Sequence, residues 1–228
     1  MGSSNPINSE SEPAWIELLG NDPRFDQKLL SDFCFDTSLC NEQMHAVSEC
    51  RIDSRSAVVV GPIEPVQDIL EISYDRSRSA LSAYEAGAQA LSLGQVAVLV
   101  LNGGLATRFG GVVKGTVDVF DNQSFLGLKI TDVTRACDLF GANIPLVVMN
   151  SFATRSQTAL HLQSHDYFGM RPDQVLSFDQ SVSIRLQENG NPFFGGDGLA
   201  RYYAPGHGEF FQRLHVSGIF DRLLQQGI

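Results

Sequence analysis

The sequence predicts a three-layer α/β fold in which a mostly parallel sheet lies between helices. Short, continuous apolar runs, as in strands that are covered on both faces, alternate with segments whose apolar residues recur at helical spacing. The first of these runs opens directly into a glycine-rich loop. The chain of 228 residues is 43% hydrophobic and 18% charged, so it can bury a core. Strands that alternate with helices imply parallel pairing through right-handed crossovers.

One main domain with an N-terminal appendage is expected, and the boundary between them lies near residue 60. Residues 1–60 are predicted to be a helical, partly disordered appendage, because the first twelve residues are rich in Ser, Asn and Glu. Helical spacing of apolar residues between 25 and 35 predicts short helices there. The pair Gly61-Pro62 then ends a connection, and residues 61–228 form the main domain.

The main domain is predicted to begin with a helix and a buried strand. Apolar residues from Leu81 to Leu91 lie on one helical face, and Gly94 stops that helix. The run 95–101 is the first predicted strand. A crossover helix follows, with Ser124 as its N-cap and Gly141 beyond its end.

Two further strands and two helices are predicted in the second half. The runs 144–149 and 175–178 are the second and third strands. Thr154 and Gln157 form a predicted capping box for a helix that ends near residue 165. The apolar spacing over 209–226 predicts one last helix.

Composition excludes several functional classes. A net charge of −10 argues against general binding to nucleic acid or anionic membranes. The most apolar run, 96–101, is too short to cross a bilayer, and the first twelve residues lack the pattern of a signal peptide. A cytoplasmic protein is therefore expected. The four cysteines have no zinc-ligand spacing and are interpreted as reduced thiols: Cys34, Cys40, Cys50 and Cys137.

The glycine-rich loop is the strongest chemical signal in the sequence. It reads Leu101-Asn-Gly-Gly-Leu-Ala-Thr-Arg-Phe-Gly-Gly-Val-Val-Lys-Gly115. Such a loop at the carboxyl end of a parallel strand lets backbone N–H groups approach phosphate oxygens, and Arg108 and Lys114 can supply positive charge. Ala106 breaks the dinucleotide-binding pattern, and the residues around Lys114 do not match a P-loop. The alternative is a turn whose glycines only permit positive φ.

Four ordered stretches make the chain similar to a known family. The loop resembles the G-G-x-G-T-x-x-G signature, followed by Pro-Lys, of nucleotidyltransferases that make nucleotide sugars, although Val113 replaces the proline. The other stretches lie at 145–152, 178–181 and 205–209, the last followed by 217–221. Together they resemble the UTP-glucose-1-phosphate uridylyltransferase family more than the N-acetylhexosamine branch.

The resemblance implies a sheet of the nucleotide-sugar nucleotidyltransferase type, truncated at its C-terminal side, so that 61–228 is an incomplete catalytic domain. The implied reaction forms UDP-sugar and pyrophosphate from UTP and a sugar 1-phosphate, with glucose 1-phosphate as the first candidate. The alternatives are another UDP-sugar pyrophosphorylase of the same fold, or a nucleotide-binding fragment without catalysis. The substrates are the expected partners, together with association through the truncated sheet edge.

The resemblance also assigns roles to individual residues. Arg108 and Lys114 would hold the triphosphate as the catalytic cations, and Gln180 would bond the uracil edge, for which an amide offers both a donor and an acceptor. The residues expected to contact substrate through their backbone or side chains are Leu101, Asn102, Gly103, Gly104, Gln180, Gly206, His207 and Gly208. By spacing alone, Gln180 could instead be a solvated turn residue and His207 a helix cap.

Two expectations concern the surroundings of the site. Asn150 and Ser151 follow the second strand and either orient the loops or cap the next helix. Mg²⁺ is expected because two anionic substrates must be brought together. By the resemblance its main carboxylate ligand lies on a strand expected after Ile228, so the metal ligands of this chain are unknown.

Overall fold

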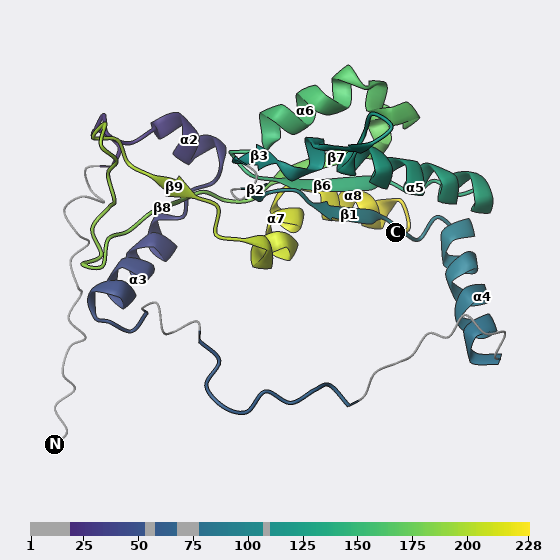
Figure 1. Cartoon of the computed structure of the whole chain (residues 1–228), viewed down its shortest axis with the longest axis horizontal. Coiled ribbons are helices and arrows are strands. Elements are labelled where there is room, and N and C mark those ends of the chain that lie inside the picture. Colours follow the sequence, from purple (N-terminus) through teal and green to yellow (C-terminus); the bar gives the residue numbers. More distant parts are fainter. Residues whose placement is uncertain (1–18, 53–57, 68–77, 107–109) are drawn as a thin grey trace. The chain divides into compact units, whose positions relative to one another are not determined.

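The computed structural model describes residues 19–52, 58–67, 78–106 and 110–228 (Figure 1). Its packing divides the chain into two compact units. One comprises Met1–Val60 and Val182–Tyr203, and the other comprises Gly61–Ser181 and Ala204–Ile228. One division falls between Val60 and Gly61, and residues 182–203 pack with the N-terminal segment and not with the sheet.

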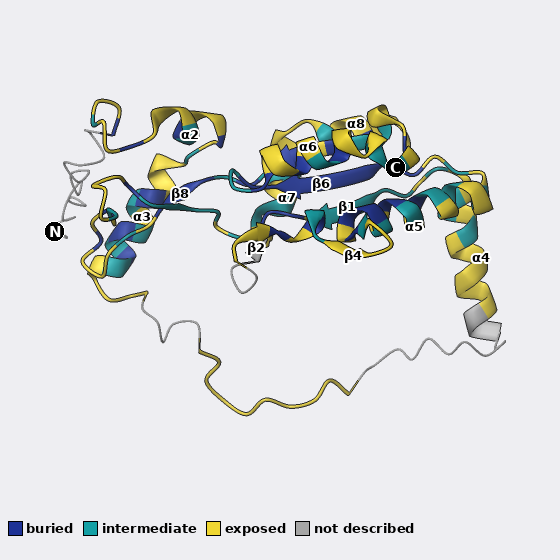
Figure 2. Cartoon of the chain, turned by 45° about the horizontal axis from the view of Figure 1, so that its top comes forward, coloured by how far each residue is buried: buried dark blue, intermediate teal, exposed yellow. Residues whose placement is uncertain are grey.

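A parallel sheet forms the centre of the second unit. Its strands are β1 (Val98–Leu101), β6 (Leu146–Asn150) and β7 (Val175–Asp179), in the order β1-β6-β7. The register pairs Leu101 with Met149 and Asn150 with Asp179. All five residues of β6 are buried, which confirms that a continuous apolar run marks a strand covered on both faces (Figure 2). β1 differs, because it is half-buried and Leu101 is 44% exposed.

Helices cover both faces of this sheet and produce the predicted three layers. On one face, Leu146 and Val148 of β6 pack with the buried side of α5 (Phe125–Phe140) and with Leu162 of α6 (Arg155–Ser164). On the other face, Val147 and Met149 pack with α7 (Phe210–Val216) and α8 (Ile219–Gln225). α4 (Arg78–Ser92) contributes Leu91 to the first face.

The predicted caps hold at α5 and fail at α6. The Ser124 hydroxyl accepts the Gly127 N–H at 3.0 Å, and Gly141 ends α5 in the left-handed region at φ 60°. The Thr154 side chain makes no cap bond to α6 and instead accepts the Ser151 N–H at 2.9 Å. Gln157 donates to the Thr116 hydroxyl at 3.1 Å. The capping box was therefore a wrong prediction, because Thr154 bonds to Ser151 before the helix and Gln157 bonds to the distant Thr116.

The predicted helix over 209–226 is two helices. Gly218 adopts φ 74°, which a helix interior does not allow, and it separates α7 from α8. Apolar spacing continues through the break, so periodicity alone could not locate it. The short elements of this unit are β2 (Leu105–Ala106), β3 (Val112–Val113), η2 (Lys114–Thr116), β4 (Asp118–Phe120), β5 (Gln123–Ser124), η3 (Asp166–Gly169), η4 (Pro172–Gln174) and η5 (His207–Glu209).

The first unit combines two helices with the segment Val182–Tyr203. The helices are α2 (Gln27–Asp32) and α3 (Thr37–Ser48), and the carboxylates of Asp26 and Asp36 cap their N-termini. α2 confirms the short helix predicted between residues 25 and 35. β8 (Ser183–Ile184) pairs with β9 (Tyr202–Tyr203). Among the described helices, none is long and apolar enough to cross a membrane.

Candidate functional site

The carboxyl ends of the three strands bring polar residues together. The Asn102 N–H donates to the Met149 carbonyl at 2.7 Å, and the Gln180 N–H donates to the Asn150 carbonyl at 2.8 Å. Both bonds continue the ladder one residue past β1 and β7. Parallel strands end at one edge of the sheet, so residues distant in sequence meet there.

A buried hydrogen-bond network fixes the start of the glycine-rich loop. The Asn102 amide donates to Asn150 Oδ1 at 3.0 Å and to Thr158 Oγ1 at 2.8 Å, and Asn150 donates to Ser177 Oγ at 2.9 Å. Asn102, Asn150 and Thr158 are at most 6% exposed. Their mutual bonds satisfy the groups that burial removes from water. The side chain of Asn102 therefore anchors the loop.

Ser151 extends this network to the next residue of the loop. Its hydroxyl donates to the Gly103 carbonyl at 2.7 Å. Of the two roles considered for Asn150 and Ser151, orientation of the loop is the one that the structure shows. Thr158 and Ser177 complete the network, and sequence reasoning missed them because no short motif contains them.

Gly103 and Gln180 lie directly against each other. A Cβ on Gly103 would come within 2.0 Å of Gln180 Oε1, so only glycine leaves room for this amide. Gln180 is 1% exposed and its Nε2 has no hydrogen-bond partner. The interpretation of Gln180 as a solvated turn residue is therefore wrong. A buried, unpaired amide nitrogen is costly and calls for an explanation in function.

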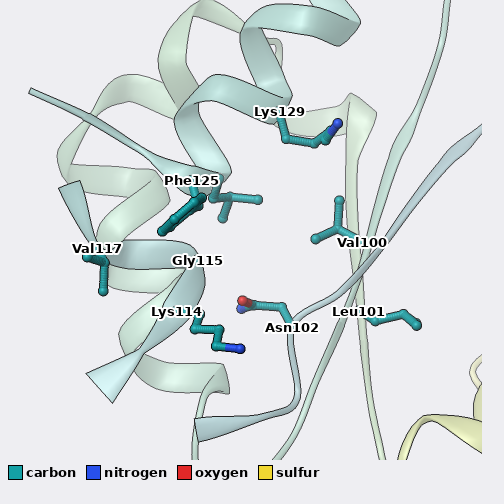
Figure 3. Close-up of a pocket in the computed structure, with 9 residues that line it drawn as sticks. Val100, Leu101, Asn102, Lys114, Gly115, Val117, Phe125 and Lys129 are labelled. Carbon is teal, nitrogen blue, oxygen red and sulfur yellow. The ribbon is translucent and has the colours of Figure 1, made fainter. Parts of the chain in front are cut away.

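A pocket of about 490 Å³ opens beside the end of β1 (Figure 3). Its wall is mainly apolar, with lysines from η2 and α5. The lining residues are Val100, Leu101, Asn102, Lys114, Gly115, Val117, Phe125, Leu126 and Lys129. At Gly115, a Cβ would come within 2.5 Å of Asn102 Oδ1, so glycine is required there for close approach.

The structure thus places the expected site residues of the loop, together with Gln180, in two groups. Leu101, Asn102 and Lys114 line the pocket. Gly103 and Gln180 lie together outside that lining, with the exposed Gly104 next in the chain. Arg108 lies outside the described residues.

The stretch Gly206-His207-Gly208 begins η5. Gly206 has φ 123°, a value that favours glycine, and His207 is exposed. The N-cap residue of α7 is Glu209, and no side-chain cap bond forms there. The interpretation of His207 as a helix cap is therefore wrong.

Asp179 places a carboxylate next to Gln180. Burial raises its pKa, while Arg155 and Arg213 oppose the shift. Arg155 Nε lies 3.5 Å from one carboxylate oxygen, and the other is buried without a hydrogen-bond partner. No group of three or more His, Cys, Asp or Glu residues in the described part of the chain could hold a metal ion.

These features define an α/β protein with a candidate ligand site at the carboxyl ends of its parallel strands, beside a glycine-rich loop. Residues 46–228 match the model of the UTP–glucose-1-phosphate uridylyltransferase family, and the chain belongs to this family.

Sequence relatives support this assignment. The chain is 34% identical over 140 residues to the UTP–glucose-1-phosphate uridylyltransferase of Saccharomyces cerevisiae, and 34% identical over 139 residues to UTP–glucose-1-phosphate uridylyltransferase 2 of Dictyostelium discoideum. These matches cover 60% and 58% of this chain but 28% and 27% of the relatives. The chain thus spans just over a quarter of the length of the curated relatives that it matches.

Solved structures confirm the fold. A variant of UDP-glucose pyrophosphorylase from Leishmania major in complex with UDP-glucose has a TM-score of 0.64 at 20% identity, over 95% of this chain and 42% of that chain. The UDP-N-acetylglucosamine pyrophosphorylase of Trypanosoma brucei has a TM-score of 0.58 at 24% identity, over 68% and 35% of the two chains. The predicted nucleotidyltransferase sheet is thereby confirmed.

Proposed function

We propose that the chain forms the UTP-binding part of a uridylyltransferase that makes UDP-sugar and pyrophosphate from UTP and a sugar 1-phosphate. The carrying observation is the Gln180 amide, which is buried against Gly103 with its nitrogen unpaired. Uracil offers carbonyl oxygens and an N–H, and an amide complements both. Since Gln180 is 1% exposed, its side chain has to rotate away from Gly103 to meet a base.

In the proposed reaction, a sugar-phosphate oxygen bonds to the α-phosphorus of UTP while the bond to the leaving pyrophosphate breaks. Such a transfer needs positioning and charge neutralisation more than covalent help. Lys114, on the wall of the pocket, supplies one cation. Arg108 is the second proposed cation, and His207 with its flanking glycines is proposed to contact phosphate or sugar.

Mg²⁺ remains part of the proposal on chemical grounds, because a divalent cation would neutralise the charge of the two anionic substrates in such a transfer. The described residues do not form a protein site for it: the pocket is lined by lysines and no carboxylate.

Glucose 1-phosphate is the proposed sugar substrate, because the sequence relatives carry that name. Comparing turnover of glucose, galactose and N-acetylglucosamine 1-phosphates tests the choice.

A cytoplasmic location of the protein is also proposed, in keeping with the free thiols. We also propose that copies associate through the edge of β1, whose only paired neighbour in the described structure is β6; light scattering at increasing concentration tests this.

The base contact is tested by Gln180→Ala. Loss of the amide should weaken UTP binding more than ATP binding by about 1–3 kcal/mol, measured by calorimetry or NMR titration. Gln174→Ala, at the opposite end of β7, is the matched control and should change neither affinity. Equal losses for both nucleotides would remove Gln180 from the base site.

The phosphate contacts are tested by Lys114→Ala and Arg108→Ala. Both should weaken UTP far more than uridine, because a charge-assisted contact needs the phosphates. Lys28→Ala is the control, since Lys28 lies on α2 in the other unit. If uridine binding falls as much as UTP binding, the loop acts only as a scaffold.

A further inference from the structure

Glu209 holds the residue that follows Gln180. One carboxylate oxygen accepts the Ser181 N–H at 2.8 Å, and the other accepts the Ser181 hydroxyl. Both residues are half-buried and lie in the second unit. An ionised carboxylate can only accept hydrogen bonds, and both oxygens of Glu209 accept from the same residue, Ser181.

The peptide group that precedes Gln180 is held as well. Arg213 of α7 donates to the Asp179 carbonyl at 3.0 Å, and the Gln180 N–H donates to Asn150. Three consecutive residues are thus each fixed by a different partner, two of them from η5 and α7. Between them, the Gln180 side-chain nitrogen is buried without a partner.

The backbone around Gln180 is thus fixed by hydrogen bonds, whereas the side-chain Nε2 of Gln180 remains an unused donor. The Gln180 amide can change partners by rotation about its side-chain bonds while its Cα stays in place. The direction in which it reaches a base then depends on how firmly the backbone is held. Small displacements matter, because hydrogen bonds weaken steeply with distance and angle.

We propose that Glu209 is a positioning residue that sets the base selectivity of the nucleotide site through Ser181 and Gln180, without touching the nucleotide. The inference rests on the proposed function, since it requires Gln180 to read the base. It explains why an acidic residue stands at the end of the Gly-His-Gly stretch, close to a site for anions. Its charge is satisfied by Ser181 and is not presented to phosphate.

The test is a double-mutant cycle on the ratio of UTP to ATP affinity in the 228-residue chain. Glu209→Ala should lower this ratio roughly tenfold, as expected for loss of a hydrogen bond to a charged group. In a Gln180→Ala background, Glu209→Ala should lower the ratio no further, because the effect passes through Gln180. Independent, additive losses would mean direct contact with the nucleotide and would overturn the inference.

Two more variants separate positioning from general damage. Glu209→Gln keeps the shape and an acceptor for the Ser181 N–H, so it should retain most of the selectivity. Glu188→Ala removes an exposed glutamate of the first unit and should leave the ratio unchanged. If Glu209→Gln loses as much selectivity as Glu209→Ala, the carboxylate charge itself is required and the positioning role is wrong.

Amide hydrogen exchange in the absence of nucleotide provides a readout that does not depend on the proposed function. Glu209→Ala should speed exchange of the Ser181 N–H and leave β6 protected, which also verifies folding. A selective wild type whose UTP-to-ATP ratio survives Glu209→Ala would overturn the inference. A wild type that binds both nucleotides alike would overturn the proposed function, and the inference with it, even if Ser181 exchange responds.

Discussion

At Gly103, the absence of one methyl group decides which side chains can meet at the strand ends. The space where its Cβ would stand is filled by the amide of Gln180, 2.0 Å away. Gly104, the next residue, has nothing within 4 Å of its Cβ position, and neither glycine has a positive φ. Glycine is therefore required for space at position 103, whereas neither space nor backbone conformation requires it at position 104.

Gly103→Ala should lower the free energy of unfolding by about 1–3 kcal/mol, because a buried side chain has to move to admit the methyl group. Gly104→Ala should stay within about 0.5 kcal/mol of wild type. Urea unfolding of both variants measures the difference. Equal effects would show that Gln180 leaves Gly103 at little cost.

The buried thiol of Cys40 is predicted to be less reactive than the exposed thiols of Cys34 and Cys50. It is 1% exposed, and burial, followed by the nearby Asp36, raises its pKa to about 11. Its thiolate fraction at pH 8 is therefore very small, while Cys34 and Cys50 are exposed. A thiol reagent at pH 8 should label Cys34 and Cys50 in the native chain and Cys40 only after unfolding, as read by peptide mass spectrometry. Labelling of native Cys40 at a similar rate would contradict the burial.

At the scale of elements, the start of α5 is coupled to α6 through one hydroxyl. Ser124 caps α5 and also contacts His161 Nε2 at 2.8 Å. Burial lowers the pKa of His161 from its ordinary value of 6.5, and His165 lowers it further, while Asp118 raises it. The neutral imidazole is thus the form that the folded chain favours.

This shift makes stability depend on pH in a definite direction. Above about pH 6.5, His161 is neutral in both the folded and the unfolded chain. As the pH falls below this value, His161 of the unfolded chain takes up a proton first, so the folded state loses stability. His161→Gln keeps a polar group near Ser124 without titrating in this range. The free energy of unfolding should therefore fall less between pH 7.5 and 5 in this variant than in wild type. Identical pH dependence in both proteins would exclude His161 as a contributor.

The elements that sequence could predict are those that local chemistry determines. The run around Val147 was sufficient to identify β6, and Ser124 with Gly141 delimited α5 from both ends. Thr154 was misjudged because its best partner is the Ser151 N–H, a bond that requires the folded strand end. Gly218 was missed because the apolar pattern is the same on both sides of the break.

The candidate site was predictable to a similar extent. The loop and Gln180 were identified from their motifs, and the structure adds that Gly103 and Gln180 are in contact. The apolar pocket beside Lys114 was not predicted, because its wall is assembled from β1, η2 and α5. The Glu209–Ser181 contact was missed for the same reason: residues far apart in sequence come together only in the fold. The substrate roles of these residues stay predictions.

At the scale of the whole chain, the N-terminal unit is built from two separate stretches of sequence. The Val182 N–H donates to the Phe33 carbonyl at 2.9 Å, and the Ala200 N–H donates to the Arg24 carbonyl at 3.0 Å. Phe25 packs edge-on against Phe194, with ring centroids 5.7 Å apart. Residues 182–203 therefore find backbone and aromatic partners in the described part of the N-terminal segment.

A chain that begins at residue 61 should expose the segment 182–203. Its backbone N–H groups lose the acceptors supplied by Arg24 and Phe33, so their hydrogen exchange should speed up markedly. Amides of β6 belong to the other unit and should keep their protection. Unchanged exchange across 182–203 would show that this segment holds its structure alone.

The divided unit also has a consequence for the order of events during synthesis. Asp26 and Tyr202, which share a hydrogen bond of 2.7 Å, are 176 positions apart. A ribosome makes the chain from its amino end, so Phe25 and Leu30 emerge early but obtain their full burial only after residue 203 has emerged. Meanwhile β1, β6 and β7 are already available to pair. The part of the protein made first thus stays incomplete until residue 203 has emerged, and during that interval its apolar side chains are open to chaperones.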